Sequence, residues 1–190
     1  MSIETPKPKL VLHICCAICG AYLSELLKDR FTIIYHYYNP NIHPREEYEK
    51  RKESVMKLAS LSDSEFIEGD YDVQNWYRTI AGFEGEPEGG KRCPLCFRMR
   101  LTKTANLALA KGATHFTTTL ASSPYKNEDV IGAIGTDIAN KLGLTFLTIA
   151  DFGEPKKEMW AKARTIAKEQ GFYHQKYCGC TFSNWMLKKS

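Results

Sequence analysis

Cysteines are the residues of this chain best suited to chemistry, and their spacing matters more than their number. The chain has seven, in three groups: Cys15, Cys16 and Cys19; Cys93 and Cys96; Cys178 and Cys180. Cysteines that only fill a core would be expected singly inside apolar segments. Where thiols stay reduced, grouped cysteines are more typical of metal binding or catalysis than of a disulfide framework.

The first two groups contain enough thiolates for a metal centre. Four thiolates suit tetrahedral zinc or a four-iron cluster equally well by number. Cys15 and Cys16 are adjacent, which makes a poor zinc knuckle, whereas neighbouring cysteines can each reach a different iron of a cluster. We therefore predict an iron–sulfur cluster at Cys15, Cys16, Cys93 and Cys96, with a purely structural zinc site as the alternative.

The third group has a different spacing and suggests a different use. Cys178 and Cys180 are separated only by Gly179, which is too tight for a zinc knuckle. They could ligate a second metal, or form a strained disulfide that is readily reduced. Cys19 could be a ligand or could simply pack, and Asp70 could be a metal ligand, a proton donor or a solvated loop acid.

Histidines and aromatic residues offer weaker candidates. His13 lies inside an apolar run, so we expect a buried core histidine rather than a ligand, while His174 lies closer to the third cysteine group. Tyr71, Trp76 and Tyr77 could stack on a nucleic-acid base. Core packing is nevertheless the expected role of at least two of these three.

The elements that position these residues follow from apolar patterning. Short apolar or β-branched runs predict strands over 9–14, 31–38, 65–67, 114–120 and 144–149. Helical periodicity predicts helices over 18–29, 44–61, 73–80, 97–111, 127–142 and 154–170. The alternation indicates an α/β fold: a Rossmann-like, doubly wound parallel sheet of about five strands, with helices on both faces.

This fold predicts where a site would form. Ligands of such sheets bind beyond the carboxyl ends of the strands. With the strand order 3-2-1-4-5, Cys15 and Cys16 would share a crevice with the loop 117–124. Cys93 and Cys96 flank the first turn of a predicted helix, where the helix dipole is expected to favour thiolates.

Length and composition set the remaining expectations. A chain of 190 residues with 43% hydrophobic residues suits one α/β domain over 1–190, with a loop insert at 82–92 and an irregular tail at 172–190 closing the site. No run approaches the roughly 20 apolar residues of a membrane span, and the N-terminus lacks a signal-peptide core, so we predict a cytoplasmic protein without membrane contact. The net charge of +4 permits an anionic partner.

Five motifs give a more specific indication. HICCAICG, YNPNIHP, GGKRCPLCFRMRL, FTTTLASSPYKN and YHQKYCGCTFS occur in this order and span the chain from Leu12 to Ser183. Together they resemble the QueH family of epoxyqueuosine reductases. One departure is Ile18, where the family commonly has proline, but this position is not a ligand.

The resemblance implies a fold, a reaction and a partner. The fold would be related to adenine-nucleotide hydrolases, but Cys15, Cys16 and Ala17 replace the phosphate-binding loop, which disfavours an ATP-dependent reaction. The reaction would be the two-electron reductive deoxygenation of epoxyqueuosine to queuosine at the wobble position of tRNA, the last step of queuosine biosynthesis. The partners would be this tRNA and an electron donor.

The resemblance also implies cofactors and residue roles. Cys15, Cys16, Cys93 and Cys96 would hold a [4Fe–4S] cluster, and Cys178 and Cys180 would be a redox-active, catalytic pair. It leaves room for an additional iron ion, whose candidate ligands are Cys19, Cys178, Cys180 and Asp70. No cobalamin is expected.

Two functions of other classes stay open on the residues alone. One is a thiol–disulfide reductase without metal, and the other is a zinc-stabilised RNA-binding module without catalysis. Metal analysis distinguishes the three, because they predict iron with sulfide, no metal, or zinc.

Overall fold

Five parallel strands form the centre of the protein. The computed structural model describes residues 6–183, and its strands are β1 (Lys9–His13), β2 (Thr32–Tyr37), β3 (Glu65–Glu68), β4 (His115–Thr118) and β5 (Thr145–Phe146). Their order across the sheet is β3-β2-β1-β4-β5. The predicted α/β class and the predicted strand order are therefore confirmed.

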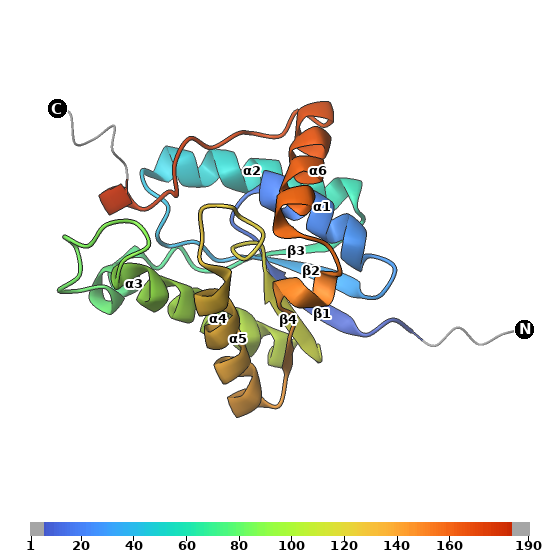
Figure 1. Cartoon of the computed structure of the whole chain (residues 1–190), viewed down its shortest axis with the longest axis horizontal. Coiled ribbons are helices and arrows are strands. Elements are labelled where there is room, and N and C mark those ends of the chain that lie inside the picture. Colours follow the sequence, from blue (N-terminus) through green and yellow to red (C-terminus); the bar gives the residue numbers. More distant parts are fainter. Residues whose placement is uncertain (1–5, 184–190) are drawn as a thin grey trace, which may run out of the picture.

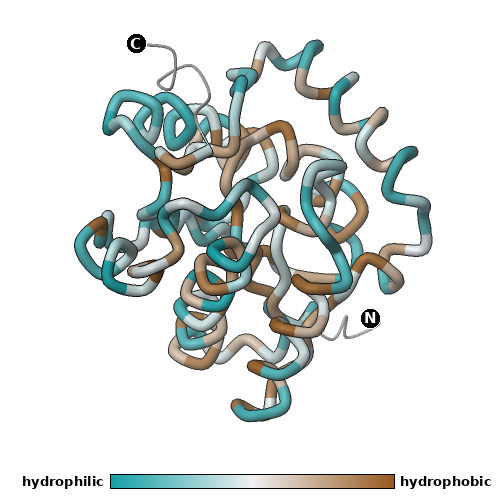
Figure 2. The backbone as a smooth tube through the Cα atoms, turned by 60° about the vertical axis from the view of Figure 1, so that its left-hand side comes forward, coloured by the Kyte–Doolittle hydropathy of each residue, from teal (hydrophilic) through white to brown (hydrophobic). Residues whose placement is uncertain are grey.

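Six helices surround this sheet, and five of them cover its two faces, while α3 packs against α4 (Figure 1). They are α1 (Ala17–Leu27), α2 (Arg45–Leu61), α3 (Val73–Thr79), α4 (Arg92–Ala110), α5 (Glu128–Leu142) and α6 (Lys156–Glu169). Helices α1, α2 and α6 lie on one face, and α4 and α5 lie on the other. Figure 2 shows hydrophilic and hydrophobic stretches alternating along the helices, as amphipathic helices require.

The side chains of β1 point alternately to the two faces of the sheet, and both faces are covered by helices. Leu10 and Leu12 contribute to the core beneath α1 and α2, whereas Val11 contributes to the core beneath α4 and α5. All three side chains are fully buried. A strand that is buried on both faces has a continuous run of apolar residues in its sequence. Such runs made it possible to predict the parallel sheet.

The predicted boundaries of two elements differ most from the structure. Strand β5 ends at Phe146, and a 3₁₀ helix (Ile149–Phe152) replaces its expected end because Thr148 and Asp151 form a capping box. Helix α4 begins at Arg92 rather than Phe97, so that Cys93 and Cys96 lie within the helix. Pro94 is compatible with this earlier start because it falls in the first turn.

The segments that surround the site are largely irregular. The loop between α3 and α4 contains turns, and the chain after α6 runs without regular structure to a 3₁₀ turn at Thr181–Ser183. The end of the predicted tail, 184–190, lies outside the described residues. Within the part that the structure describes, the helices are all too short or too polar to cross a membrane.

Candidate active site

The first cysteine group lies where β1 gives way to α1, at the carboxyl end of the central strand. Cys16 is the N-cap residue of α1, and Cys19 follows in the first turn. The backbone N–H of Cys15 donates to Thr119 Oγ1 at 3.3 Å, and Asn39 Nδ2 donates to the carbonyl oxygen of Ile14 at 2.9 Å. The turn that carries the cysteines is therefore fixed by two neighbouring loops, as the predicted crevice requires.

The sulfur atoms of Cys15, Cys16 and Cys19 lie within 4.8 Å of one another. Over residues 6–183, this is the sole cluster of three or more cysteine, histidine or acidic side chains close enough to share a metal ion. The Cys16 and Cys19 thiols hydrogen-bond to Cys15 and hold its pKa well below the usual range, despite burial. The same contact raises the pKa of Cys16 to about 12, and that of Cys19 also rises.

A buried arginine stands beside this group. Arg100, from α4, donates from Nη2 to Asn39 Oδ1 at 2.6 Å and from Nε to His13 Nε2 at 3.3 Å. Burial and the charge of Arg100 lower the pKa of His13, so His13 stays neutral and accepts this bond. His13 is therefore a buried core histidine with hydrogen-bond partners, as predicted.

The second and third cysteine groups meet each other on the far side of the site. Cys96 and Cys180 are buried in one small apolar cluster with Trp76 and Ile80, and Cys178 packs against it. The helix start was expected to favour thiolates here, but the burial of the two thiols acts in the opposite direction. Burial raises the pKa of Cys93 and of Cys96 and outweighs the backbone and Arg100 contributions.

Long-range hydrogen bonds hold the tail that carries the third group. Arg51 is 2% exposed and donates to the carbonyl oxygens of Tyr177 at 2.9 Å and Cys178 at 3.1 Å. Gln175 Nε2 lies 3.0 Å from Cys16 Sγ, which ties the tail to the first cysteine group. Gly179 has a φ of +99°, and a Cβ there would lie 2.8 Å from Ile42, so the residue between the two cysteines must be glycine.

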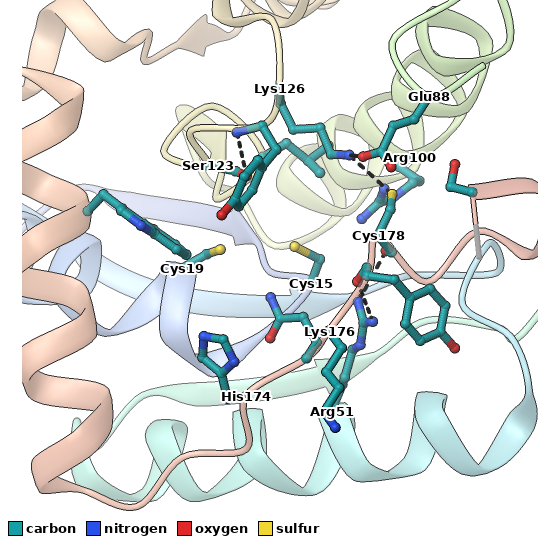
Figure 3. Close-up of a pocket in the computed structure, with 16 residues that line it drawn as sticks. Cys15, Cys19, Arg51, Glu88, Arg100, Ser123, Lys126, His174, Lys176 and Cys178 are labelled. Atoms are coloured by element: carbon teal, nitrogen blue, oxygen red, sulfur yellow. Dashed lines mark hydrogen bonds and ion pairs between the residues drawn. The ribbon is translucent and has the colours of Figure 1, made fainter. Parts of the chain in front are cut away.

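A cavity of about 640 Å³ lies between the cysteine groups (Figure 3). Its wall includes Cys15 and Cys19 on one side and Cys178 on the other. The charged lining residues are four cations and one carboxylate: Arg51, Arg100, Lys126, Lys176 and Glu88. This volume is in the range of small-molecule sites, and the excess of cations suits an anionic ligand.

Lys126 connects two walls of this cavity. Its Nζ atom donates to Cys178 Sγ at 3.2 Å and pairs with the carboxylate of Glu88, as the dashed lines of Figure 3 show. Burial opposes the lysine charge, but Cys178 and Glu88 outweigh it and raise the pKa of Lys126. Lys126 is therefore a protonated, fixed cation in contact with the redox candidate.

The residues present fit an iron–sulfur group. Thiols are the soft ligands that such a cluster uses, and the four candidate thiols are buried (Cys16, Cys96) or half-buried (Cys15, Cys93). The buried guanidinium groups of Arg51 and Arg100 act on these thiols and would balance negative charge. The indole N–H of Trp76, in the cluster with Cys96 and Cys180, acts on the Cys96 sulfur as a hydrogen-bond donor and lowers the pKa of that thiol. Such a donor suits a sulfur acceptor, since buried N–H groups are rarely left unpaired.

Several candidates fall elsewhere. Asp70 is exposed and does not line the cavity, whereas His174 is exposed and lines it. Trp76 is fully buried and so cannot stack on a base, which agrees with the expected core role. Arg51, Asn39 and Gln175 were not among the predicted site residues, although Asn39 and Gln175 lie inside the motifs YNPNIHP and YHQKYCGCTFS.

Comparisons with known proteins agree on one family. The sequence matches the family model described as "Epoxyqueuosine reductase QueH" over residues 10–185. Three curated proteins of that name are similar along most of their length. The protein from Haemophilus influenzae is 39% identical, and the alignment covers 92% of this chain and 71% of that protein. The protein from Thermotoga maritima is 36% identical, with 92% of this chain and 89% of that protein covered. The one from Streptococcus pyogenes serotype M1 is 34% identical over 95% and 72%.

Among solved structures, the U34-tRNA thiolase NcsA from Methanococcus maripaludis, solved with its [4Fe-4S] cluster, aligns with a TM-score of 0.47 and 9% identity. The alignment covers 88% of this chain and 69% of that one. A likeness this weak carries no argument about function.

Proposed function

This chain belongs to the QueH family of epoxyqueuosine reductases, and from this premise we propose that the cavity between Cys15 and Cys178 is where the epoxide is reduced. One observation carries the proposal: two chemically different groups of cysteines open onto the same basic cavity. Neither a metal-free thiol reductase nor a zinc-stabilised RNA-binding module is favoured by the family assignment.

The substrate is a tRNA that carries epoxyqueuosine at the wobble position. Removal of the epoxide oxygen gives the cyclopentene of queuosine, consumes two electrons and two protons, and releases water. A polyanionic tRNA suits the cations of the cavity wall. Because tRNA is a cytoplasmic substrate and the thiols must stay reduced, the enzyme is proposed to act in the cytoplasm.

The cluster ligands are proposed to be Cys15, Cys16, Cys93 and Cys96. Arg100 supports this grouping because its charge acts on both Cys15 and Cys96, so that one thiol of each pair lies near the same guanidinium. A [4Fe–4S] cluster held there would supply electrons one at a time. An additional iron ion would find its ligands among Cys19, Cys178 and Cys180, since Asp70 is exposed and outside the cavity wall.

Cys178 and Cys180 are proposed as the two-electron store. Closing two thiols to a disulfide releases two electrons and two protons, which is the amount that epoxide removal consumes. Arg51 holds the backbone of the pair, and Gly179 permits the tight turn between the two sulfurs. An external electron donor must then reduce the disulfide before the next turnover.

Metal analysis of two cysteine variants tests these assignments. Anaerobically purified wild type should contain about four sulfide per chain, about four iron from the cluster and a fifth where the additional ion binds, with cluster absorption. Cys93→Ser should lose both, whereas Cys178→Ser should keep the cluster and lose turnover with tRNA. Retention of full iron and sulfide in Cys93→Ser would overturn the ligand assignment, and undiminished turnover in Cys178→Ser would overturn the dithiol role.

A further inference from the structure

An exposed aromatic residue stands at the mouth of the cavity. Tyr125 is 77% exposed, the highest value among the large hydrophobic side chains of the described residues, and it lines the cavity. Trp160, on α6, lines the same cavity and is only partly buried. An exposed ring beside a site contributes little to folding, which points to a ligand that uses it.

The two rings are arranged so that a planar group can meet both. Their centroids are 6.5 Å apart and their planes are inclined by 82°. A nucleic-acid base that stacks on one ring therefore meets the edge of the other, which is a favourable aromatic arrangement. Every base has such a face, so stacking needs no particular sequence.

Helix α6 continues from Trp160 as a basic surface. Arg164 and Lys168 follow at intervals of four residues, so they lie on the same side of the helix. Both are exposed and line a second hollow, of about 660 Å³. His174 lines both this hollow and the cysteine-lined cavity, so the two are neighbours.

We propose that Tyr125 and Trp160 stack an unpaired base of the tRNA anticodon loop next to the modified nucleotide, while Arg164 and Lys168 contact the phosphates of the same loop. The inference deepens the proposed function and rests on it. The order of the features is what a single-stranded loop requires: a cavity for one nucleotide, rings for its neighbour and cations for the backbone.

Binding of a fluorescein-labelled anticodon stem-loop with guanosine at the wobble position tests the surface directly. Tyr125→Leu and Trp160→Leu should each weaken the Kd about tenfold, while Tyr125→Phe should stay within about twofold of wild type. Arg164→Met and Lys168→Met should each lower the salt slope of log K by about 0.7. Lys157→Met removes an exposed charge of α6 that lines neither hollow, and it should leave the slope unchanged.

A second probe reports stacking rather than affinity. A stem-loop with 2-aminopurine on either side of the wobble nucleotide should be quenched by wild type and by Tyr125→Phe, but not by Tyr125→Leu. If Tyr125→Leu kept wild-type affinity and quenching, the inference would be overturned. Because Tyr125 is exposed, its replacement should not affect folding, so this test stands even if Trp160→Leu does not fold. Turnover of modified tRNA by wild type, measured separately, judges the proposed function on its own.

Discussion

Arg51 Nη1 donates a hydrogen bond to the carbonyl oxygen of Cys178 at 3.1 Å, although 127 residues separate them. The same guanidinium is buried and pairs through Nε with Glu47 at 2.8 Å. Arg51, a residue of α2, thus fixes the backbone of the proposed redox pair through its buried guanidinium.

Replacing Arg51 with methionine should therefore be costly. It leaves the Glu47 carboxylate buried without its cation, which costs about 3–5 kcal/mol of the free energy of unfolding. Urea unfolding at neutral pH measures this. The double variant Arg51→Met/Glu47→Gln should recover part of the loss, because no unpaired charge remains.

Arg45→Met is the matched control for Arg51→Met. Arg45 and Glu49 have the same spacing on the same helix, but the Arg45 side chain is 53% exposed. Such a pair contributes about 1 kcal/mol or less. If both arginine variants lost the same stability, burial would not be what makes Arg51 important.

His36 should make stability fall in mild acid. Burial lowers its pKa to about 4, and its Nδ1 lies 3.0 Å from Thr104 Oγ1. In the unfolded chain a histidine has a pKa of about 6.5, so as pH falls the unfolded state takes up the proton before the folded state does. The contribution of neutral His36 is therefore complete above pH 6.5 and is lost as pH falls toward 4.

The comparison with His36→Asn isolates this effect, since asparagine can still donate to Thr104. Between pH 7.5 and 5.5 the wild type should lose about 1 kcal/mol more stability than the variant. Urea unfolding at the two pH values measures the difference. An equal loss in both proteins would show that His36 does not titrate as its burial demands.

The sequence predicted the sheet because its strands are buried on both faces and its helices are amphipathic. It also placed Cys15 and Cys16 at a strand end, which is a local property. It could not predict that Gln175 would contact Cys16, or that Arg51 would hold Cys178, because neither pairing leaves a periodic pattern. It placed the start of α4 too late, at Phe97 rather than Arg92, although it expected Cys93 and Cys96 beside the first helical turn.

Two glycines of α5 should respond in opposite ways to the same substitution. A Cβ on Gly135 would lie 2.5 Å from the ring of Phe146, whereas one on Gly132 would meet nothing closer than 3.9 Å. Gly135→Ala should therefore cost about 1–3 kcal/mol through overpacking. Gly132→Ala should gain about 0.5–1 kcal/mol from helix propensity. Thermal unfolding of both variants checks this, and a gain in Gly135→Ala would mean that Phe146 moves freely.

Asn39 should support metal loading without being a ligand. It is fully buried, donates to the carbonyl oxygen of Ile14, and accepts from Arg100. Asn39→Leu removes both bonds, so it should cost about 1–3 kcal/mol and loosen the turn that presents Cys15. Iron and sulfide content after anaerobic reconstitution should fall below wild type.

Asn41→Leu and Asn39→Asp separate positioning from packing. Asn41 is equally buried in the same turn, but its Oδ1 has no partner within 6–183, so its replacement should leave iron content near wild type. Asn39→Asp keeps an acceptor for Arg100 but loses the donor to Ile14, and it should load iron to an intermediate level. If Asn39→Leu bound as much iron as Asn41→Leu, the Ile14 and Arg100 bonds would not be what shapes the cysteine turn for its metal.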